Sequence, residues 1–149
     1  MIAVVQRVSR ASVSIGCHVT ASIGPGLVVL AAVHADDTSA EVAKTADKLL
    51  TLRVFPEHDK PYHRDVTQVG GGVLLVPNFT VAADTSSGRR PALHPAAPPD
   101  VARELFRLLV RLTQARHPLV AEGEFGADMH VEIHNDGPLT LLLEIRRKA

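Results

Sequence analysis

The chain has 149 residues, and its sixteen basic and sixteen acidic side chains give a formal net charge of zero at pH 7. A chain of about 150 residues buries roughly two thirds of its unfolded surface. A composition that is 46% hydrophobic therefore excludes a disordered chain and predicts one domain over residues 1–149. The zero net charge and 3% aromatic content exclude a broad electrostatic or stacking grip on nucleic acid.

The sequence contains a single cysteine, Cys17, which cannot form an intramolecular disulfide. Its first residues lack the basic and then apolar pattern of a signal peptide. No apolar run approaches the roughly 20 residues of a membrane span. We therefore expect a reducing, cytoplasmic location and no membrane association.

The first part of the chain is predicted to form strands. Residues 2–8 have the composition of a strand, and residues 11–15 and 18–23 form the pattern of a hairpin around Gly16. Residues 27–33 are apolar throughout, which predicts a central strand covered on both faces.

A helix and a short hairpin are predicted next. Thr38 and Glu41 have the spacing of a capping box, and the apolar periodicity that follows predicts a helix to about Thr51. Residues 52–55 are predicted to be a strand. Residues 56–68 are polar and contain two prolines, which indicates a surface loop or an edge hairpin.

The second half begins with a buried strand at residues 73–76 and a long irregular segment at residues 82–99. Asp100 is predicted to cap a second helix that ends at residues 117–118. The apolar stripe of this helix is predicted to consist of Val101, Leu105, Leu108, Leu109 and Leu112. Two strands are expected at residues 131–133 and 139–145. About seven strands and two helices indicate a mixed α/β domain.

Metal and phosphate sites are not predicted. Residues 70–72 are three glycines that precede a strand, so they lack the helix N-terminus that phosphate binding uses. His130 and His134 have the spacing of zinc ligands on a helix, but on a strand their Cα atoms are about 13 Å apart. We expect no metal and no cofactor.

Thr80, directly after the buried strand, is a candidate nucleophile. A threonine hydroxyl needs an adjacent base, and none is evident from the sequence. The alternative is an ordinary β-branched surface residue.

The order and the amino-acid sequences of these segments resemble those of the D-aminoacyl-tRNA deacylases, the D-tyrosyl-tRNA deacylase family. The resemblance covers nearly the whole chain and is carried by MIAVVQRVSRASV, IGPGLVVLAAV, KLLTLRVF, GGGVLLVPNFTVAADTSSGRRP, AAPP, GEFGADM and NDGPLT. It implies a homodimer with a mostly antiparallel sheet, a barrel-like core and two helices. It also implies an enzyme that hydrolyses the ester between a D-amino acid and the 3′-terminal adenosine of tRNA, a chiral proofreading step of translation, without a cofactor.

Two family motifs carry the implied site. One is Ser-Gln-Phe-Thr, here Pro77, Asn78, Phe79 and Thr80, and the other is Asn-x-Gly-Pro-x-Thr, here Asn135, Gly137, Pro138 and Thr140. The resemblance implies that the Gly-Pro bond is cis and enters the partner subunit's site. There its carbonyl oxygens would capture the substrate's amino group and leave no room for an L side chain.

Three further residues match family positions. Arg7 matches an arginine that braces the Gly-Pro loop, and Phe125 and Met129 match residues that line the site. The alternative readings are a solvated strand arginine and two core side chains.

Catalysis is implied to involve Asn78, Phe79 and Thr80. The backbone N–H groups of Phe79 and Thr80 suit an ester oxyanion. Either Thr80 attacks the ester, or the 2′-hydroxyl of the terminal ribose assists hydrolysis. We favour the second account because no base is evident beside Thr80.

Pro77 and Asn78 depart from the family's Ser-Gln. Proline removes a hydroxyl and an N–H, and asparagine is one methylene shorter than glutamine, so we expect altered contacts to the terminal adenosine. The alternatives are a glycyl- or L-alanyl-tRNA deacylase and a non-catalytic tRNA-binding dimer. A related branch that acts on L-alanyl-tRNA also has this proline but changes the phenylalanine, so Phe79 favours the D-specific branch.

Two basic clusters are expected to hold tRNA phosphates. They are Arg89-Arg90, in the long irregular segment, and Arg146-Arg147-Lys148, near the end of the chain.

Overall fold

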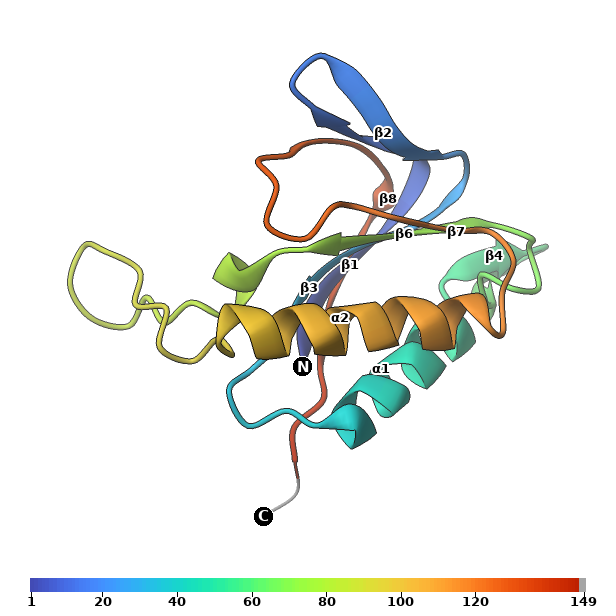
Figure 1. Ribbon diagram of the computed structural model, residues 1–149. Helices are drawn as coiled ribbons and strands as arrows, with labels where there is room; N and C mark the ends of the chain where they lie inside the picture. The colour runs from blue at the N-terminus through green and yellow to red at the C-terminus, as the bar shows by residue number, and fades with distance from the viewer. Residues whose placement is uncertain (148–149) are drawn as a thin grey trace.

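The computed structural model describes residues 1–147, and its sheet is built around one long strand (Figure 1). This strand, β1 (Ile2–Ile15), pairs along one edge with β8 (His130–Glu144). Its other edge pairs first with β3 (Gly26–Ala32) and then with β2 (His18–Ile23). The prediction of separate strands at 2–8 and 11–15 is therefore wrong, because irregular pairing between Gln6 and Arg10 disturbs β1 without ending it.

Parallel strands extend the sheet beyond β3. The strand β6 (Gly72–Pro77) pairs parallel with β3, and β7 (Val120–Glu122) pairs parallel with β6. The order is β2-β1-β3-β6-β7, with β8 on the free side of β1, so the predicted central position of β3 is confirmed. A Cβ placed on Gly72 would lie 2.9 Å from the side chain of Ile23, because the sheet curls toward a nearly closed barrel.

The two faces of β3 and β6 are both buried, as their apolar sequences require. Leu27 and Val29 pack with both helices, whereas Val28 packs into a second cluster on the opposite face. Along β6, Leu75 and Leu74 divide in the same way. Side chains alternate along a strand, so a strand covered on both faces is apolar at every position.

Two helices cover one face of the sheet (Figure 1). The first, α1 (Ser39–Thr51), begins with the predicted capping box, in which Ala40 N donates to Thr38 Oγ1 at 3.3 Å and Thr38 N donates to Glu41 Oε2 at 3.0 Å. The hydrogen bonds from Thr38 hold the pKa of the Glu41 carboxyl below its usual value. The predicted end of this helix at Thr51 is confirmed.

The second helix, α2 (Pro99–Gln114), differs from its prediction at both ends. Pro98 is its N-cap without a side-chain bond, and Asp100 lies in the first turn, because Pro99 already has the φ that a first helical residue needs. The helix ends at Gln114, before residues 117–118. Val101, assigned to the apolar stripe, is 45% exposed. The buried side is formed by Ala102, Phe106, Leu109, Val110 and Thr113, with Leu105, Leu108 and Leu112 partly buried beside it.

The polar segment after α1, predicted to be a surface loop or an edge hairpin, forms a hairpin of β4 (Phe55–Glu57) and β5 (Lys60–Arg64) that is a two-stranded sheet separate from the main one. The strand predicted at 52–55 is wrong, because the N–H of Leu52 donates to Lys48 O and closes the helix instead. The strands predicted at 131–133 and 139–145 are two halves of one irregular strand, β8. Within residues 1–147, no helix is both long and apolar enough to cross a membrane.

A buried charge pair fixes the loop that follows β3. The ammonium of Met1 donates to Asp37 Oδ1 at 2.6 Å, and Asp37 Oδ2 accepts from His34 N at 2.7 Å. Pro95 O then accepts from Ala35 N at 3.0 Å. These bonds connect Met1, the residue before β1, through the loop to Pro95, which directly precedes two residues of the cavity wall, Ala96 and Ala97.

Candidate active site

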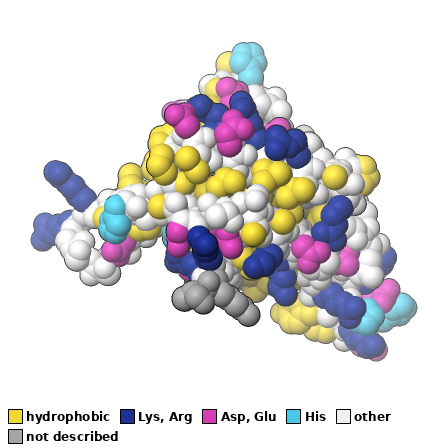
Figure 2. All heavy atoms as spheres, turned by 60° about the horizontal axis from the view of Figure 1, so that its bottom comes forward, with side chains coloured by type: hydrophobic (Ala, Val, Ile, Leu, Met, Phe, Trp, Pro, Cys, Tyr) yellow, Lys and Arg dark blue, Asp and Glu magenta, His cyan; other side chains and the backbone are white. Residues whose placement is uncertain are grey.

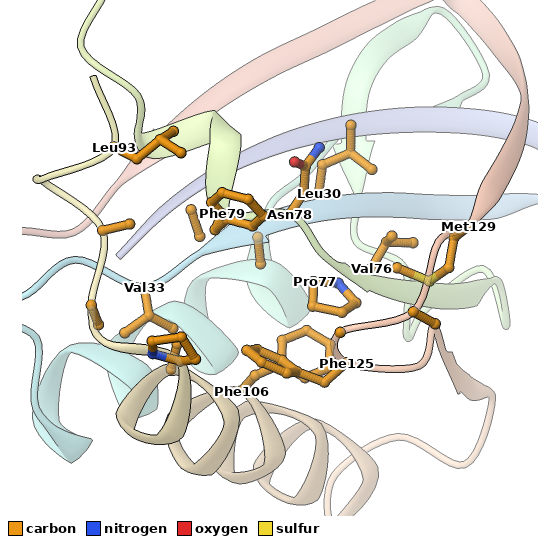
Figure 3. A pocket seen from close by; sticks show the side chains of 18 of the residues that line it. Leu30, Val33, Val76, Pro77, Asn78, Phe79, Leu93, Phe106, Phe125 and Met129 are labelled. Atoms are coloured by element: carbon orange, nitrogen blue, oxygen red, sulfur yellow. The ribbon is translucent and has the colours of Figure 1, made fainter. Parts of the chain in front are cut away.

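A cavity of about 1000 Å³ lies where the parallel strands β3 and β6 end (Figure 3). Ala31 pairs with Pro77, so the carboxyl ends of both strands meet at one edge, and the segment after β7 closes the same region. Ligands commonly bind at the carboxyl ends of parallel strands, because the chain leaves the sheet there. The remaining walls come from residues 96–99, from the first turns of α2, and from Leu93, Val131 and Ile133.

The first motif lies at this edge. Pro77 is the last residue of β6, and Asn78 and Phe79 line the cavity with it (Figure 3). Phe79 begins a short 3-10 helix, η1 (Phe79–Ala82), and is 56% exposed. Within residues 1–147, the N–H groups of Phe79 and Thr80 donate to no carbonyl, as expected for the first residues of a helical turn.

Thr80 is exposed and is not among the cavity-lining residues. Its hydroxyl donates to Asn78 Oδ1 at 2.6 Å. An amide oxygen accepts this proton without removing it, so the bond orients the hydroxyl but supplies no base.

The proline at position 77 breaks no sheet bond. The pairing of β6 with β7 stops at Leu75, and the ladder to β3 continues past the proline, because Asn78 N donates to Ala31 O at 2.8 Å. Proline is tolerated at such a strand end. The Pro77–Asn78 departure therefore changes the cavity wall and leaves the sheet intact.

Phe125 and Met129 are both lining residues and core residues. Phe125 packs against the helix-side core, with its ring centroid 6.2 Å from that of Phe106. The guanidinium of Arg103 lies 5.3 Å from the ring centroid of Phe125. Met129 packs against the opposite cluster. Both side chains thus pack in the core and also line the cavity, which lies between the two clusters, and their part in the implied substrate site stays a prediction.

The second motif is a bulge in β8. Gln6 pairs with Thr140 and Val8 with Asn135, so residues 136–139 lie opposite Arg7 alone. Arg7 Nη1 donates to Val54 O at 2.6 Å, and its Nε lies 3.2 Å from Asp136 Oδ2. The predicted bracing of the Gly-Pro segment by Arg7 agrees with these contacts.

The base of the bulge is closed by its own motif residues. Asn135 Nδ2 donates to Thr140 Oγ1 at 2.9 Å, and Asn135 Oδ1 accepts from Leu139 N at 3.2 Å. Gln6 Nε2 also donates to Thr140 Oγ1, at 3.1 Å. Leu139 is buried in the helix-side core, so the bulge is anchored at this residue.

Gly137 and Pro138 remain exposed at the end of the bulge, and the peptide bond between them is cis. Gly137 has φ +124°, and a Cβ there would lie 2.9 Å from Leu139 N. Only glycine fits this backbone conformation without strain. Neither residue lines the cavity of its own chain, so the two motifs form separate groups.

Several lining residues were not predicted from the sequence. They are apolar positions of a strand, a loop and helix α2, such as Leu30, Leu93 and Phe106, and one exposed acid, Asp128. The apolar ones carry no signal beyond ordinary core periodicity. Among the described lining residues, Asp128 is the single titratable side chain, and no histidine is present.

The basic clusters lie outside the cavity. Arg89 and Arg90 are exposed in the long segment between η1 and α2, and Arg146 and Arg147 are exposed after β8. Arg146 pairs with Glu144 at 2.5 Å. Lys148, the third residue of the second cluster, lies outside the described residues.

The cavity is lined mainly by apolar side chains, and Phe79, one of its lining residues, has a backbone N–H that donates to no carbonyl within residues 1–147. The chain belongs to the D-Tyr-tRNA(Tyr) deacylase family, because the family model with that description matches residues 4–144.

Full-length relatives agree with this assignment. The chain is 50% identical over 146 residues to a D-aminoacyl-tRNA deacylase of Herminiimonas arsenicoxydans, with 98% of each chain covered. It is 48% identical over 151 aligned positions to a D-aminoacyl-tRNA deacylase of Burkholderia mallei (strain SAVP1), covering 98% of this chain and 99% of the relative.

Two solved structures have the same fold. One is described as c-Myc DNA Unwinding Element Binding Protein, with a TM-score of 0.94, 37% identity, and coverage of 99% of this chain and 100% of that chain. The other is described as a probable eukaryotic D-amino acid tRNA deacylase, with a TM-score of 0.82, 15% identity, and coverage of 95% and 97%. The implied mixed fold with two helices is thereby confirmed.

Gly123 controls the position of Met129 and gives a test of the cavity. An added Cβ would lie 2.8 Å from Met129 Sδ, so Gly123→Ala should displace this flexible side chain within the cavity wall. We expect hydrolysis of D-Tyr-tRNA to lose kcat/KM on the order of tenfold, about 1.4 kcal/mol. Urea unfolding should change by less than about 1 kcal/mol. Gly24→Ala is the control, because nothing lies within 4 Å of its added Cβ, and equal losses in both variants would contradict the prediction.

Proposed function

We propose that the cavity binds the aminoacylated 3′-terminal adenosine of tRNA, and that the Gly137–Pro138 bulge of a second copy completes the site. Family membership makes the reaction hydrolysis of a D-aminoacyl-tRNA ester, which releases a free D-amino acid and tRNA.

The observation that carries the proposal is the separation of the two motifs. Arg7, Asn135 and Thr140 hold a bulge whose end is exposed and lies outside the cavity of its own chain. A segment held this firmly, yet with no target in its own chain, is suited to reach into a neighbouring molecule. In an isologous dimer the contact between a bulge and a cavity can form twice, because each copy has one bulge and one cavity.

The surface around β8 also favours a second copy. Within residues 1–147, β8 pairs only with β1, so the other edge of a 15-residue strand is open. Leu142, close to the bulge, is 65% exposed, and Leu141 is 39% exposed. A long open edge with apolar side chains is normally covered by another chain.

Chirality would be read by the backbone of the bulge. The carbonyl oxygens of the partner's Gly137 and the partner's Pro138 are acceptors for the substrate's α-ammonium group. With the ammonium and the ester both held, only one of the two remaining directions at the α-carbon has room for a side chain. The site would therefore accept different D side chains and exclude L ones, and it would not reject glycine by this contact.

The hydrolytic step would use the N–H groups of Phe79 and Thr80. Both are free in residues 1–147; Phe79 lines the cavity and Thr80 is the next residue along the chain, so the pair can bind the oxyanion that forms when the ester is attacked. Among the described residues, the Thr80 hydroxyl has no base within hydrogen-bond distance, since its partner is the amide oxygen of Asn78. The attacking water would then be assisted by the 2′-hydroxyl of the terminal ribose.

The substrate preference is tested by comparing D-Tyr-tRNA with L-Tyr-tRNA. We expect the D ester to be hydrolysed at least about 100-fold faster, because an L side chain meets the backbone of the bulge. Equal rates would contradict reading by the bulge. If L-alanyl- or glycyl-tRNA were hydrolysed faster than D-Tyr-tRNA, the enzyme would have an altered specificity, which we would attribute to Pro77 and Asn78 in the cavity wall. Binding of tRNA without turnover would indicate a non-catalytic dimer.

The roles of Thr80 and the ribose are separated by Thr80→Ala. This variant keeps the backbone N–H, so we expect kcat within about threefold of wild type, whereas a substrate with a 2′-deoxy terminal adenosine should lose at least about 100-fold. Thr80→Ser, which retains the hydroxyl, is the control. Abolished turnover in Thr80→Ala with full activity on the 2′-deoxy substrate would identify Thr80 as the nucleophile.

The shared site is tested by mixing two inactive variants. Gly137→Val would distort the bulge, because its Cβ meets Leu139 N, and Ala127→Trp would fill the cavity from an irregular segment. Refolded together, half of the dimers contain one of each copy, and each mixed dimer has one intact site. We expect recovery of about a quarter of wild-type activity. No recovery, with mixed dimers shown by mass spectrometry, would place both motifs in one protomer's site.

A further inference from the structure

Residues 84–92 form a projecting arm between η1 and α2, here called the arginine arm (Figure 1). Its two ends are joined by paired bonds, in which Asp84 N donates to Ala92 O and Ala92 N to Asp84 O, both at 2.9 Å. Gly88, with φ +73°, allows the chain to turn between them. The arm is therefore a closed loop with a defined base.

The only acidic side chain of the arm, Asp84, lies at its base and forms a hydrogen bond within the arm. Asp84 Oδ1 accepts from Ser86 N at 2.9 Å. This bond, a second one with the Ser86 hydroxyl and the nearby His94 hold the pKa of the Asp84 carboxyl below its usual value. The carboxylate thus stays ionised at neutral pH and organises the turn.

The far part of the arm carries two neighbouring cations, Arg89 and Arg90. Both are exposed, and residues 85–99 contain no acid. Figure 2 shows Lys or Arg side chains that stand clear of the body at the end of this arm, on the left. The arm therefore presents two positive charges on a chain whose formal net charge is zero.

Most other arginines of the described chain have a carboxylate partner within 4.0 Å, whereas Arg89 and Arg90 have none there. The paired ones are Arg7, Arg10, Arg64, Arg103, Arg107, Arg116 and Arg146. Arg53, after α1, and Arg111, in the last turn of α2, are also exposed and lack such a partner. These two provide a matched comparison, because they carry the same charge away from the arm.

The arm leads directly into the wall of the cavity. Leu93, the residue after the arm, lines the cavity, and so do Ala96 and Ala97. Arg90 precedes Leu93 by three residues, which span at most about 11 Å of extended chain. A nucleoside seated in the cavity would therefore have its next phosphates within reach of the arm.

We propose that Arg89 and Arg90 bind the phosphates of the single-stranded RNA immediately 5′ of the terminal adenosine. The inference rests on the proposed binding of the aminoacylated 3′ end in the cavity. Guanidinium groups bind phosphate oxygens through two parallel hydrogen bonds, and unpaired ones need not break an existing ion pair first. The cavity holds the nucleoside and the ester, while the arm guides the strand that leaves it.

The test compares an Arg89→Ala/Arg90→Ala variant with an Arg53→Ala/Arg111→Ala control. Each is assayed on D-Tyr-tRNA, on the D-tyrosyl ester of a short 3′-terminal oligonucleotide, and on D-tyrosyl-adenosine, which has no phosphate. The arm variant should have a raised KM and an unchanged kcat on the first two substrates and wild-type kinetics on the third. Loss of two phosphate contacts to single-stranded RNA should also reduce the slope of log kcat/KM against log salt concentration by about 1.4. Between about 50 and about 200 mM salt, kcat/KM of the wild type should therefore fall by a factor about sevenfold larger than that of the arm variant.

Three results would overturn the inference. An equal loss of activity on D-tyrosyl-adenosine would make the arm a structural element of the cavity. A loss confined to full tRNA would place the contact beyond the single strand. An equal loss in the control variant would show that the effect does not depend on the arm. Binding of uncharged tRNA by the same variants, followed by fluorescence anisotropy, separates this inference from the proposed function. Arm-dependent binding without any turnover would support the arm and reject the proposed chemistry, whereas turnover without arm dependence would do the reverse.

Discussion

The mismatch between one arginine of β1 and four unpaired residues of β8 is the constraint on which the site depends. Opposite Arg7, β8 contains residues 136–139, so the ladder between β1 and β8 must expel a loop at this point. Arg7 holds that loop from one side and bonds to Val54 on the other. The side chain of Asp136 is largely exposed, so the ion pair itself is worth little, and the buried contacts of Arg7 and Leu139 supply the main hold.

The cavity depends on a second feature, the parallel ends of β3 and β6. Both strands are apolar on two faces, so they lie between two hydrophobic clusters and cannot shift without exposing one of them. Their rigid ends place Pro77, Asn78 and Phe79 at one edge. The catalytic groups proposed here are backbone N–H groups, and backbone groups are positioned only as well as the strands that carry them.

Sequence patterns predicted the elements better than their details. The capping box of α1, the central position of β3 and the hairpin after α1 were confirmed because each has a local physical signal. The Asp100 cap was wrong because Pro99 begins α2, and the helix stripe included Val101 because periodicity alone does not tell which side meets the sheet. The division of β1 was wrong because an irregular pairing depends on the opposite strand, β8, which is far away in sequence.

The sequence by itself determined the family, through two motifs and their order, and it identified Arg7, Phe125 and Met129 as residues near the implied site. Only the tertiary structure decided how these residues are grouped. Gly137 and Pro138 are far from Phe79 along the chain, and only the fold shows that they also stay outside its cavity. Likewise, the sequence contains Arg89 and Arg90, but their position beside the cavity follows from the bonds that close the arm. Composition and motifs are local properties, whereas the meeting of distant segments is set by strand pairing and burial across the whole chain.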